Sequence, residues 1–163
     1  MAKIKVRLVV NGEEVRLTTE PGKTLLQVLR QDLSLLSVKE GCSQGDCGSC
    51  IVIMNGQAVN SCLVLAAQAE GADLVTLEGL AKNGHLSALQ RRFAELWAFQ
   101  CGFCTAGMLM SCYALLQYNP QPTREEIRTA IEGNLCRCTS YRAVIDAVQA
   151  SAEMGLLRRD SRD

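Results

Sequence analysis

The chain has 163 residues, carries 17 basic and 17 acidic side chains, and is 4% aromatic. Balanced charge gives no electrostatic reason to expect nucleic acid or an anionic membrane as partner, and scarce aromatics leave few platforms for stacking bases. No run approaches the roughly 18–20 apolar residues of a membrane span, and the N-terminus lacks the apolar core of a secretory signal. We therefore expect a cytoplasmic protein with no membrane span.

The first half of the chain shows the patterns of a small sheet with one helix. Apolar residues alternate over residues 3–10, and Asn11-Gly12 is a strong hairpin turn signal. Thr24 opens a short helical pattern that stops near Asp32. The expected strands cover residues 3–10, 13–19, 51–54, 57–60 and 73–77. The order ββαβββ suits a β-grasp sheet packed on one helix.

The second half changes to helical periodicity. Four helices are expected, at residues 87–97, at 105–118, from a capping box that begins at Thr123, and at 141–154. We expect a first domain over residues 1–79, a linker over 80–86, a second domain over 87–157 and a charged tail over 158–163. The fold class is therefore α+β: a β-grasp domain followed by a four-helix domain.

Nine cysteines are the unusual feature of the composition. They are clustered, odd in number and not preceded by a secretory signal, so they favour metal binding in a reducing compartment over a disulfide framework. Cys112 lies apart from the others in an apolar helical run and is expected to be a buried free thiol. His85 is the sole histidine, which excludes a Rieske centre and disfavours a histidine general base.

The first cysteine set comprises Cys42, Cys47, Cys50 and Cys62. Its C-x4-C-x2-C run lies in a loop over residues 37–50, with the spacing of a plant-type ferredoxin loop that binds one [2Fe–2S] cluster. Zinc sites usually present paired C-x2-C knuckles, and a phosphate loop would end in Lys-Ser/Thr, so the pattern favours iron–sulfur. Glycines that allow positive φ and close approach supply the tight backbone path: Gly41, Gly45 and Gly48.

The second cysteine set comprises Cys101 and Cys104 in a C-x2-C pair and Cys136 and Cys138 in a C-x-C pair. Side chains two residues apart diverge on a helix but face the same way in extended backbone, so these ligands are expected at helix ends. Free N–H groups and the positive end of the helix dipole favour an anionic centre there. On spacing alone, both an iron–sulfur cluster and a four-thiolate zinc site remain open.

Three separated motifs resemble those of one family. Residues 40–50 read EGCSQGDCGSC, residues 100–105 read QCGFCT, and residues 133–139 read GNLCRCT. This order resembles the small iron–sulfur subunit of the molybdenum hydroxylases, the xanthine dehydrogenase, aldehyde oxidoreductase and carbon monoxide dehydrogenase family. The resemblance covers nearly the whole chain and favours a [2Fe–2S] cluster on the second cysteine set as well as on the first.

The resemblance implies an electron-transfer subunit of an oxidoreductase, with no substrate chemistry on this chain. A large subunit would carry molybdopterin and hydroxylate a small molecule, a medium subunit would carry FAD, and the complex would be of a kind that can dimerise. Electrons would pass from molybdenum to the second cysteine set, then to the first set, which lies nearer the flavin, and on to FAD or another acceptor. Gln100 would contact the pterin, and Cys138 would lie beside it.

Two residues depart from the family pattern. Ala106 stands where the family usually has proline, and Ser140 stands where it usually has glycine. Alanine is a good helix former, so we expect a small effect at the first position. A free-standing two-cluster ferredoxin is an alternative function, although plant-type ferredoxins are strongly acidic and this chain is neutral. A zinc-binding interaction module is a further alternative.

Overall fold

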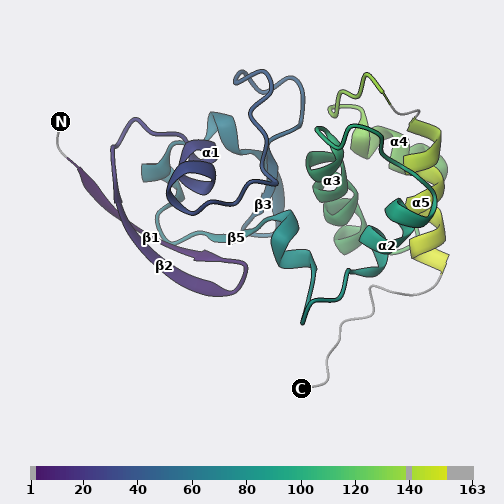
Figure 1. Ribbon diagram of the computed structural model, residues 1–163, viewed down its shortest axis with the longest axis horizontal. Helices are drawn as coiled ribbons and strands as arrows, with labels where there is room; N and C mark the ends of the chain where they lie inside the picture. The colour runs from purple at the N-terminus through teal and green to yellow at the C-terminus, as the bar shows by residue number, and fades with distance from the viewer. Residues whose placement is uncertain (1–2, 139–140, 154–163) are drawn as a thin grey trace.

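The computed structural model describes residues 3–138 and 141–153 and shows two domains side by side (Figure 1). A sheet with one short helix forms the first domain, and helices form the second, which confirms the α+β class. Ser140 and the tail at 158–163 lie outside the described residues. Within the part of the chain that is described, no helix is long and apolar enough to cross a membrane.

The first domain is built on a five-stranded sheet with the strand order β2-β1-β5-β3-β4. Its strands are β1 (Ile4–Val10), β2 (Glu13–Thr19), β3 (Ile51–Met54), β4 (Gln57–Asn60) and β5 (Asp73–Val75). Strand β1 pairs antiparallel with β2 and parallel with β5, while β3 pairs antiparallel with both β4 and β5. The order and pairing are those expected of a β-grasp sheet.

The last strand is shorter than predicted, since it ends at Val75 and not at residue 77. Asn11 is the cause, because its Oδ1 accepts a hydrogen bond from the Thr76 backbone N–H at 2.8 Å. This side chain takes the donor that a longer strand would use in its ladder, and a 3₁₀ turn follows at Leu77–Leu80.

Helix α1 (Leu25–Gln27) continues into a wider turn at Val28–Asp32, as the short helical pattern predicted. A capping box between Thr24 and Gln27 starts it. Its apolar face covers the sheet, and the domain core combines both elements. The core includes Leu8, Leu25, Leu26, Val28, Leu29, Val52 and Leu74, each at most 1% exposed.

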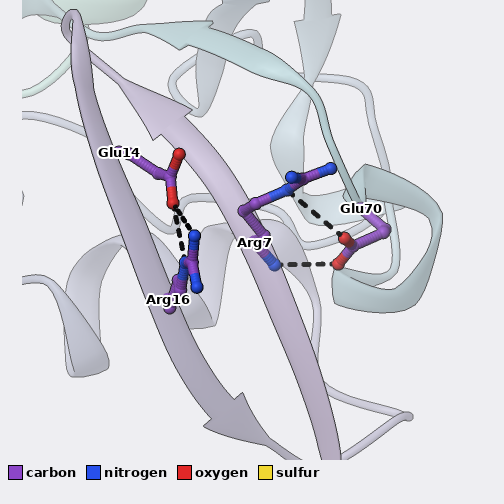
Figure 2. Close-up of polar contacts among 4 residues, drawn as sticks. All are labelled: Arg7, Glu14, Arg16 and Glu70. Atoms are coloured by element: carbon purple, nitrogen blue, oxygen red, sulfur yellow. Dashed lines mark hydrogen bonds and ion pairs between the residues drawn. The ribbon is translucent and has the colours of Figure 1, made fainter.

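The exposed face of β1 and β2 carries two arginines in opposite positions of the ladder, Arg7 and Arg16. Like charges directly opposite one another destabilise a sheet, but each arginine has its own acidic partner (Figure 2). Arg16 bonds Glu14 on the same strand at 2.6 Å, and the backbone N–H of Arg7 donates to Glu70 at 2.8 Å. Both contacts are exposed and contribute little energy, and the Arg7 contact holds the segment at Glu70 against β1.

The second domain contains α2 (Ala88–Glu95), α3 (Thr105–Tyr118), α4 (Arg124–Ile131) and α5 (Tyr141–Glu153). Capping boxes at Ser87 and Thr123 start α2 and α4. Helix α2 ends two residues earlier than predicted, because the chain turns out of the helix at Trp97, whose φ is +51°. Trp97 is 77% exposed and lies outside the core of this domain.

The two domains share an apolar contact. Helix α3 faces the sheet domain in Figure 1, and its Met110 is fully buried against Ile53 of β3 and Leu80. Between the domains, Lys82 and His85 exchange two backbone hydrogen bonds in a tight turn. The predicted limits of the domains and linker remain predictions, but the shared contact fixes how the two cysteine sets face one another.

Candidate metal centres

The first cysteine set lies where the loop of residues 41–50 meets the β3–β4 hairpin. Cys50 immediately precedes β3, and Cys62 lies in a 3₁₀ turn that follows β4. These two cysteines are buried, whereas Cys42 and Cys47 are partly exposed. The thiol of Cys50 lies beside that of Cys62, and the thiol of Cys47 lies beside that of Cys42. The four sulfurs therefore form an inner pair and an outer pair.

The three loop glycines meet two different constraints. Gly45 and Gly48 have φ of +90° and +67°, a region that side-chain-bearing residues rarely adopt. Gly41 is required by close approach, because a Cβ there would lie 2.8 Å from Sγ of Cys47. A side chain at that position would displace one of the outer sulfurs.

Backbone donors converge on Cys42. The N–H groups of Asp46 and Gln44 point at its Sγ at 3.3 and 3.5 Å. Hydrogen bonds from the backbone of Gln44 and Cys47 lower the pKa of this thiol from 9.0 to about 6. The loop thus stabilises a thiolate at Cys42 before any metal is considered, as backbone donors do at reactive and metal-binding cysteines.

The second cysteine set also forms two pairs. Sγ of Cys138 lies 3.7 Å from Sγ of Cys101, and both residues are exposed. The thiol of Cys104 lies beside that of Cys136, and both of these residues are partly buried. Cys104 is the N-cap residue of α3, so the expectation that these cysteines lie at a helix end holds for it. The segment between Asn134 and Cys138 is not helical, as the C-x-C spacing predicted.

Burial sets the pKa values of the inner thiols. Desolvation raises the pKa of Cys62 to about 11 and that of Cys104 to about 12. The hydrogen bond with Cys101 raises the pKa of Cys138. Metals bind the thiolate form, so occupancy of these sites releases protons from the inner thiols.

The donor set fits a two-iron cluster. Each [2Fe–2S] centre takes four thiolates, two on each iron, and each cysteine set offers two sulfur pairs that come from separate segments. A single zinc ion instead needs four ligands that converge on one point. The residues present therefore suit [2Fe–2S] at both places.

The structure also shows where the other residues singled out in the sequence analysis lie. Gln100 is exposed next to Cys101. Cys112 is fully buried in the core of the helical domain, which confirms the prediction of a buried free thiol. His85 lies in the turn between the domains. Ala106 is buried in the first turn of α3 and leaves the predicted helix intact.

Sequence reasoning missed three polar residues that support the sites. Asn60 donates to the Gly45 carbonyl at 3.1 Å, and Asn134 donates to the Gly48 carbonyl at 3.1 Å. The Tyr141 hydroxyl accepts from the Cys136 backbone N–H at 3.0 Å and donates to the Asn134 carbonyl at 2.7 Å. The only sequence signal was position, since each lies within a few residues of a cysteine.

Two family models match the chain in succession. Residues 8–81 match a 2Fe-2S iron-sulfur cluster binding domain, and residues 76–149 match a [2Fe-2S] binding domain. The matches divide the cysteines as the sequence analysis did, with one set in each model. The chain therefore has two [2Fe–2S]-binding domains.

Similar proteins span almost the full length of the chain. It is 52% identical to the nicotinate dehydrogenase small FeS subunit of Eubacterium barkeri, covering 94% of this chain and 98% of that protein. It is 46% identical to the xanthine dehydrogenase iron-sulfur-binding subunit of Escherichia coli O157:H7, covering 89% and 92%. Among solved structures, a chain of quinoline 2-oxidoreductase from Pseudomonas putida 86 matches with a TM-score of 0.90 and 42% identity, covering 96% of this chain and 100% of that one.

Proposed function

Because the chain belongs to the family of small iron–sulfur subunits of the molybdenum hydroxylases, we propose that it carries two [2Fe–2S] clusters and relays electrons between partner subunits. The chain is an iron–sulfur subunit of an oxidoreductase, and electron transfer is its role. In the proposal, a large molybdopterin-containing subunit supplies the electrons, and FAD on a medium subunit or another acceptor receives them. The observation that carries the proposal is the arrangement of eight cysteines as two sulfur pairs in each [2Fe–2S]-binding domain.

The sulfur pairs suggest which cysteines share an iron. In the first set, Cys42 and Cys47 would hold one iron, and Cys50 and Cys62 the other. In the second set, Cys101 and Cys138 would hold one iron, and Cys104 and Cys136 the other. Each cluster, when bound, accepts and releases one electron at a time.

The exposure of the sulfurs supports an order for the two clusters. Cys101 and Cys138 are exposed beside Gln100, which is itself exposed and in this proposal contacts a pterin on the large subunit. An exposed pair allows a partner's redox group to come close, whereas the outer pair of the first set, Cys42 and Cys47, is only partly exposed and its inner pair is buried. We therefore place the second cysteine set next to molybdenum and the first set next to the acceptor.

The proposal also includes a cytoplasmic location for the protein and the limits of its two domains. Free cysteines in two metal-binding sets suit the reducing cytoplasm, where such thiols stay available for iron. The domain limits at residues 1–79 and 87–157, with a linker at 80–86, fit one cluster in each domain. Dimerisation of the whole complex is part of the proposal as well.

Metal analysis with electron paramagnetic resonance of the reduced protein tests this function. We expect about four irons per chain and two distinct rhombic signals. Cys138→Ser should abolish one signal and leave the plant-type signal, whereas the matched control Cys112→Ala should leave both. Two intact signals in Cys138→Ser would refute the ligand assignment, and a colourless protein that contains zinc would refute the function.

Native co-purification tests the partners. A large partner that contains molybdenum is the expected result. A stable monomer that carries both clusters and retains no partner would refute the subunit role and leave a free-standing carrier.

A further inference from the structure

The two cysteine sets are joined directly by hydrogen bonds between their loops. The Cys47 carbonyl accepts from the Leu135 backbone N–H at 3.0 Å, and Leu135 is bonded to Cys136. The next carbonyl, that of Gly48, accepts from Nδ2 of Asn134 at 3.1 Å. Consecutive residues of one loop thus bond consecutive residues of the other, across a sequence separation of 86 residues for the Asn134 bond.

At this contact the two backbones lie too close together for side chains to fit between them. A Cβ on Gly48 would lie 2.5 Å from the Gly133 carbonyl oxygen, and one on Gly107 would lie 2.0 Å from the Gly48 carbonyl oxygen. Phe103, between the cysteines of the C-x2-C pair, lies over the other loop, since its Cε1 is 3.6 Å from the Cβ position of Gly41. The loops therefore meet backbone to backbone.

Asn134 is held in this contact at a cost. It is 1% exposed, and its Oδ1 is buried without a hydrogen-bond partner among the described residues. An unsatisfied buried acceptor is unfavourable and calls for an explanation. The backbone of Asn134 is fixed from the other side by the Tyr141 hydroxyl, at 2.7 Å from its carbonyl. The Tyr141 contact therefore holds the backbone of Asn134 where its side-chain amide can donate to the Gly48 carbonyl.

We propose that Asn134 is a positioning residue for electron transfer between the two clusters, which it serves by clamping the Gly48 carbonyl so that the Cys47–Leu135 hydrogen bond stays closed. The inference rests on the proposed function, since it requires both clusters. The closed bond gives a continuous path from Sγ of Cys47 through its carbonyl, across one hydrogen bond, and along Leu135 to Sγ of Cys136. The Asn134–Gly48 bond lies one residue further from a cysteine on each side, so its path between the two sulfurs is longer.

The step is a transfer of one electron. Cys101, Cys104, Cys136 and Cys138 would hold the donor cluster, and Cys42, Cys47, Cys50 and Cys62 would hold the acceptor cluster. The bound clusters would supply one-electron redox chemistry, so the one electron lost at the second set would be the one gained at the first. No bond forms or breaks, and no proton moves in the path. Asn134 touches neither cluster's ligand sulfurs in the described contacts and acts through the Gly48 carbonyl.

The experiment compares Asn134→Ala with wild type in the assembled complex. Asn119→Ala is the matched control, because Asn119 donates its amide to Glu126 at 3.1 Å, at the end of α3. Iron content and the two paramagnetic signals report cluster assembly. The magnetic splitting between the two reduced clusters and the single-turnover rate of electron passage from one to the other report their coupling.

We expect Asn134→Ala to retain both signals and full iron while it loses the splitting and slows the passage. Hydrogen exchange at the Leu135 amide should become about tenfold faster, because a buried hydrogen bond that closes this contact is gone. Asn119→Ala should match wild type in every readout. Unchanged splitting, passage rate and exchange in Asn134→Ala with both clusters present would overturn the inference.

Two further results distinguish a failure of the proposed function from a failure of the inference about Asn134. A wild-type complex that lacks one cluster would overturn the proposed function itself, before any variant is compared. If Asn134→Ala does not assemble, exchange in the wild type decides the inference. The Leu135 amide should then exchange slowly although its residue is 57% exposed, and rapid exchange would overturn the clamp.

Discussion

Gly107→Ala is the sharpest test of how the two domains meet. Gly107 lies in the first turn of α3, where replacing glycine with alanine in an exposed helix would stabilise it by about 0.8–1 kcal/mol. Here the added Cβ would lie 2.0 Å from the Gly48 carbonyl oxygen and 3.0 Å from Cα of Ser49. Both neighbours are backbone atoms, so no side-chain rotation relieves the clash, and the loop must move away from the helix.

Gly107→Ala should lower the stability of the protein, although the higher helix propensity of alanine alone would raise it. Overpacking of this kind costs about 1–3 kcal/mol or more, and after the gain in propensity we expect a net loss of about 2 kcal/mol. For a chain of this length that is a fall in Tm of about 4–8 °C. Thermal unfolding followed by circular dichroism and by visible absorption of the clusters measures it.

Gly133→Ala provides the matched control. A Cβ on Gly133 would meet nothing within 4 Å, although this glycine lies in the same contact region. Its Tm should correspond to a change within about 0.5 kcal/mol of wild type. A Gly107→Ala protein with the wild-type Tm, or a higher one, would refute the claim that the backbones of the two domains touch at this point.

Two other predictions concern Cys112 and Tyr141. Burial raises the pKa of the Cys112 thiol from 9.0 to about 12, so its contribution to stability is complete below about pH 9 and is lost as the pH rises toward 12. The stability difference between wild type and Cys112→Ala, measured by denaturant unfolding, should therefore fall by about 1.4 kcal/mol per pH unit above pH 9, and a constant difference would contradict the burial. Tyr141→Phe removes the hydroxyl that bonds the Cys136 N–H and the Asn134 carbonyl, so a redox titration should show a shifted potential for the second cluster and an unchanged one for the first. Equal shifts in both clusters would count against this local role.

Local patterns predicted most of the first domain. Alternation and the Asn11-Gly12 turn gave β1 and β2 with their bounds correct to one residue, because period-two burial and a two-residue turn together set the register. The end of β5 was wrong because a side chain from a distant turn, Asn11, replaced the next ladder bond. No period in the sequence reports such a contact.

The cysteine sets were predictable for a different reason. Metal-ligand spacing is a local property of a loop, so the C-x4-C-x2-C run could be recognised without the fold. The pairing of sulfurs within each set was not predictable, because spacing says which cysteines belong together and not which two are adjacent. The Cys101–Cys138 pair joins segments that meet only through the packing of the helical domain.

The contact between the loops had one usable sequence signal. Glycine inside a predicted helix is unfavourable by about 1 kcal/mol, so Gly107 called for a packing reason. The neighbour that Gly107 must accommodate, Gly48, belongs to the other domain. Gly48 has a positive φ, which by itself accounts for a glycine at that position. Neither local sequence indicates a contact with the other segment, and only the folded structure shows that both glycines lie in a single contact.

This contact also explains why two small domains remain together. A core of about 75 residues supplies only about 3–5 kcal/mol, and the loop of residues 41–50 has few apolar side chains of its own. Met110, Ile53 and Leu80 add an apolar contact that neither domain has alone. The carbonyls of Cys47 and Gly48 each accept a hydrogen bond from the helical domain, and Gly48 also accepts one at 3.4 Å from the Ile51 N–H of its own domain. The loop that would hold the first cluster therefore depends on the domain that would hold the second, so the structure that brings the clusters together is also part of what keeps each loop folded.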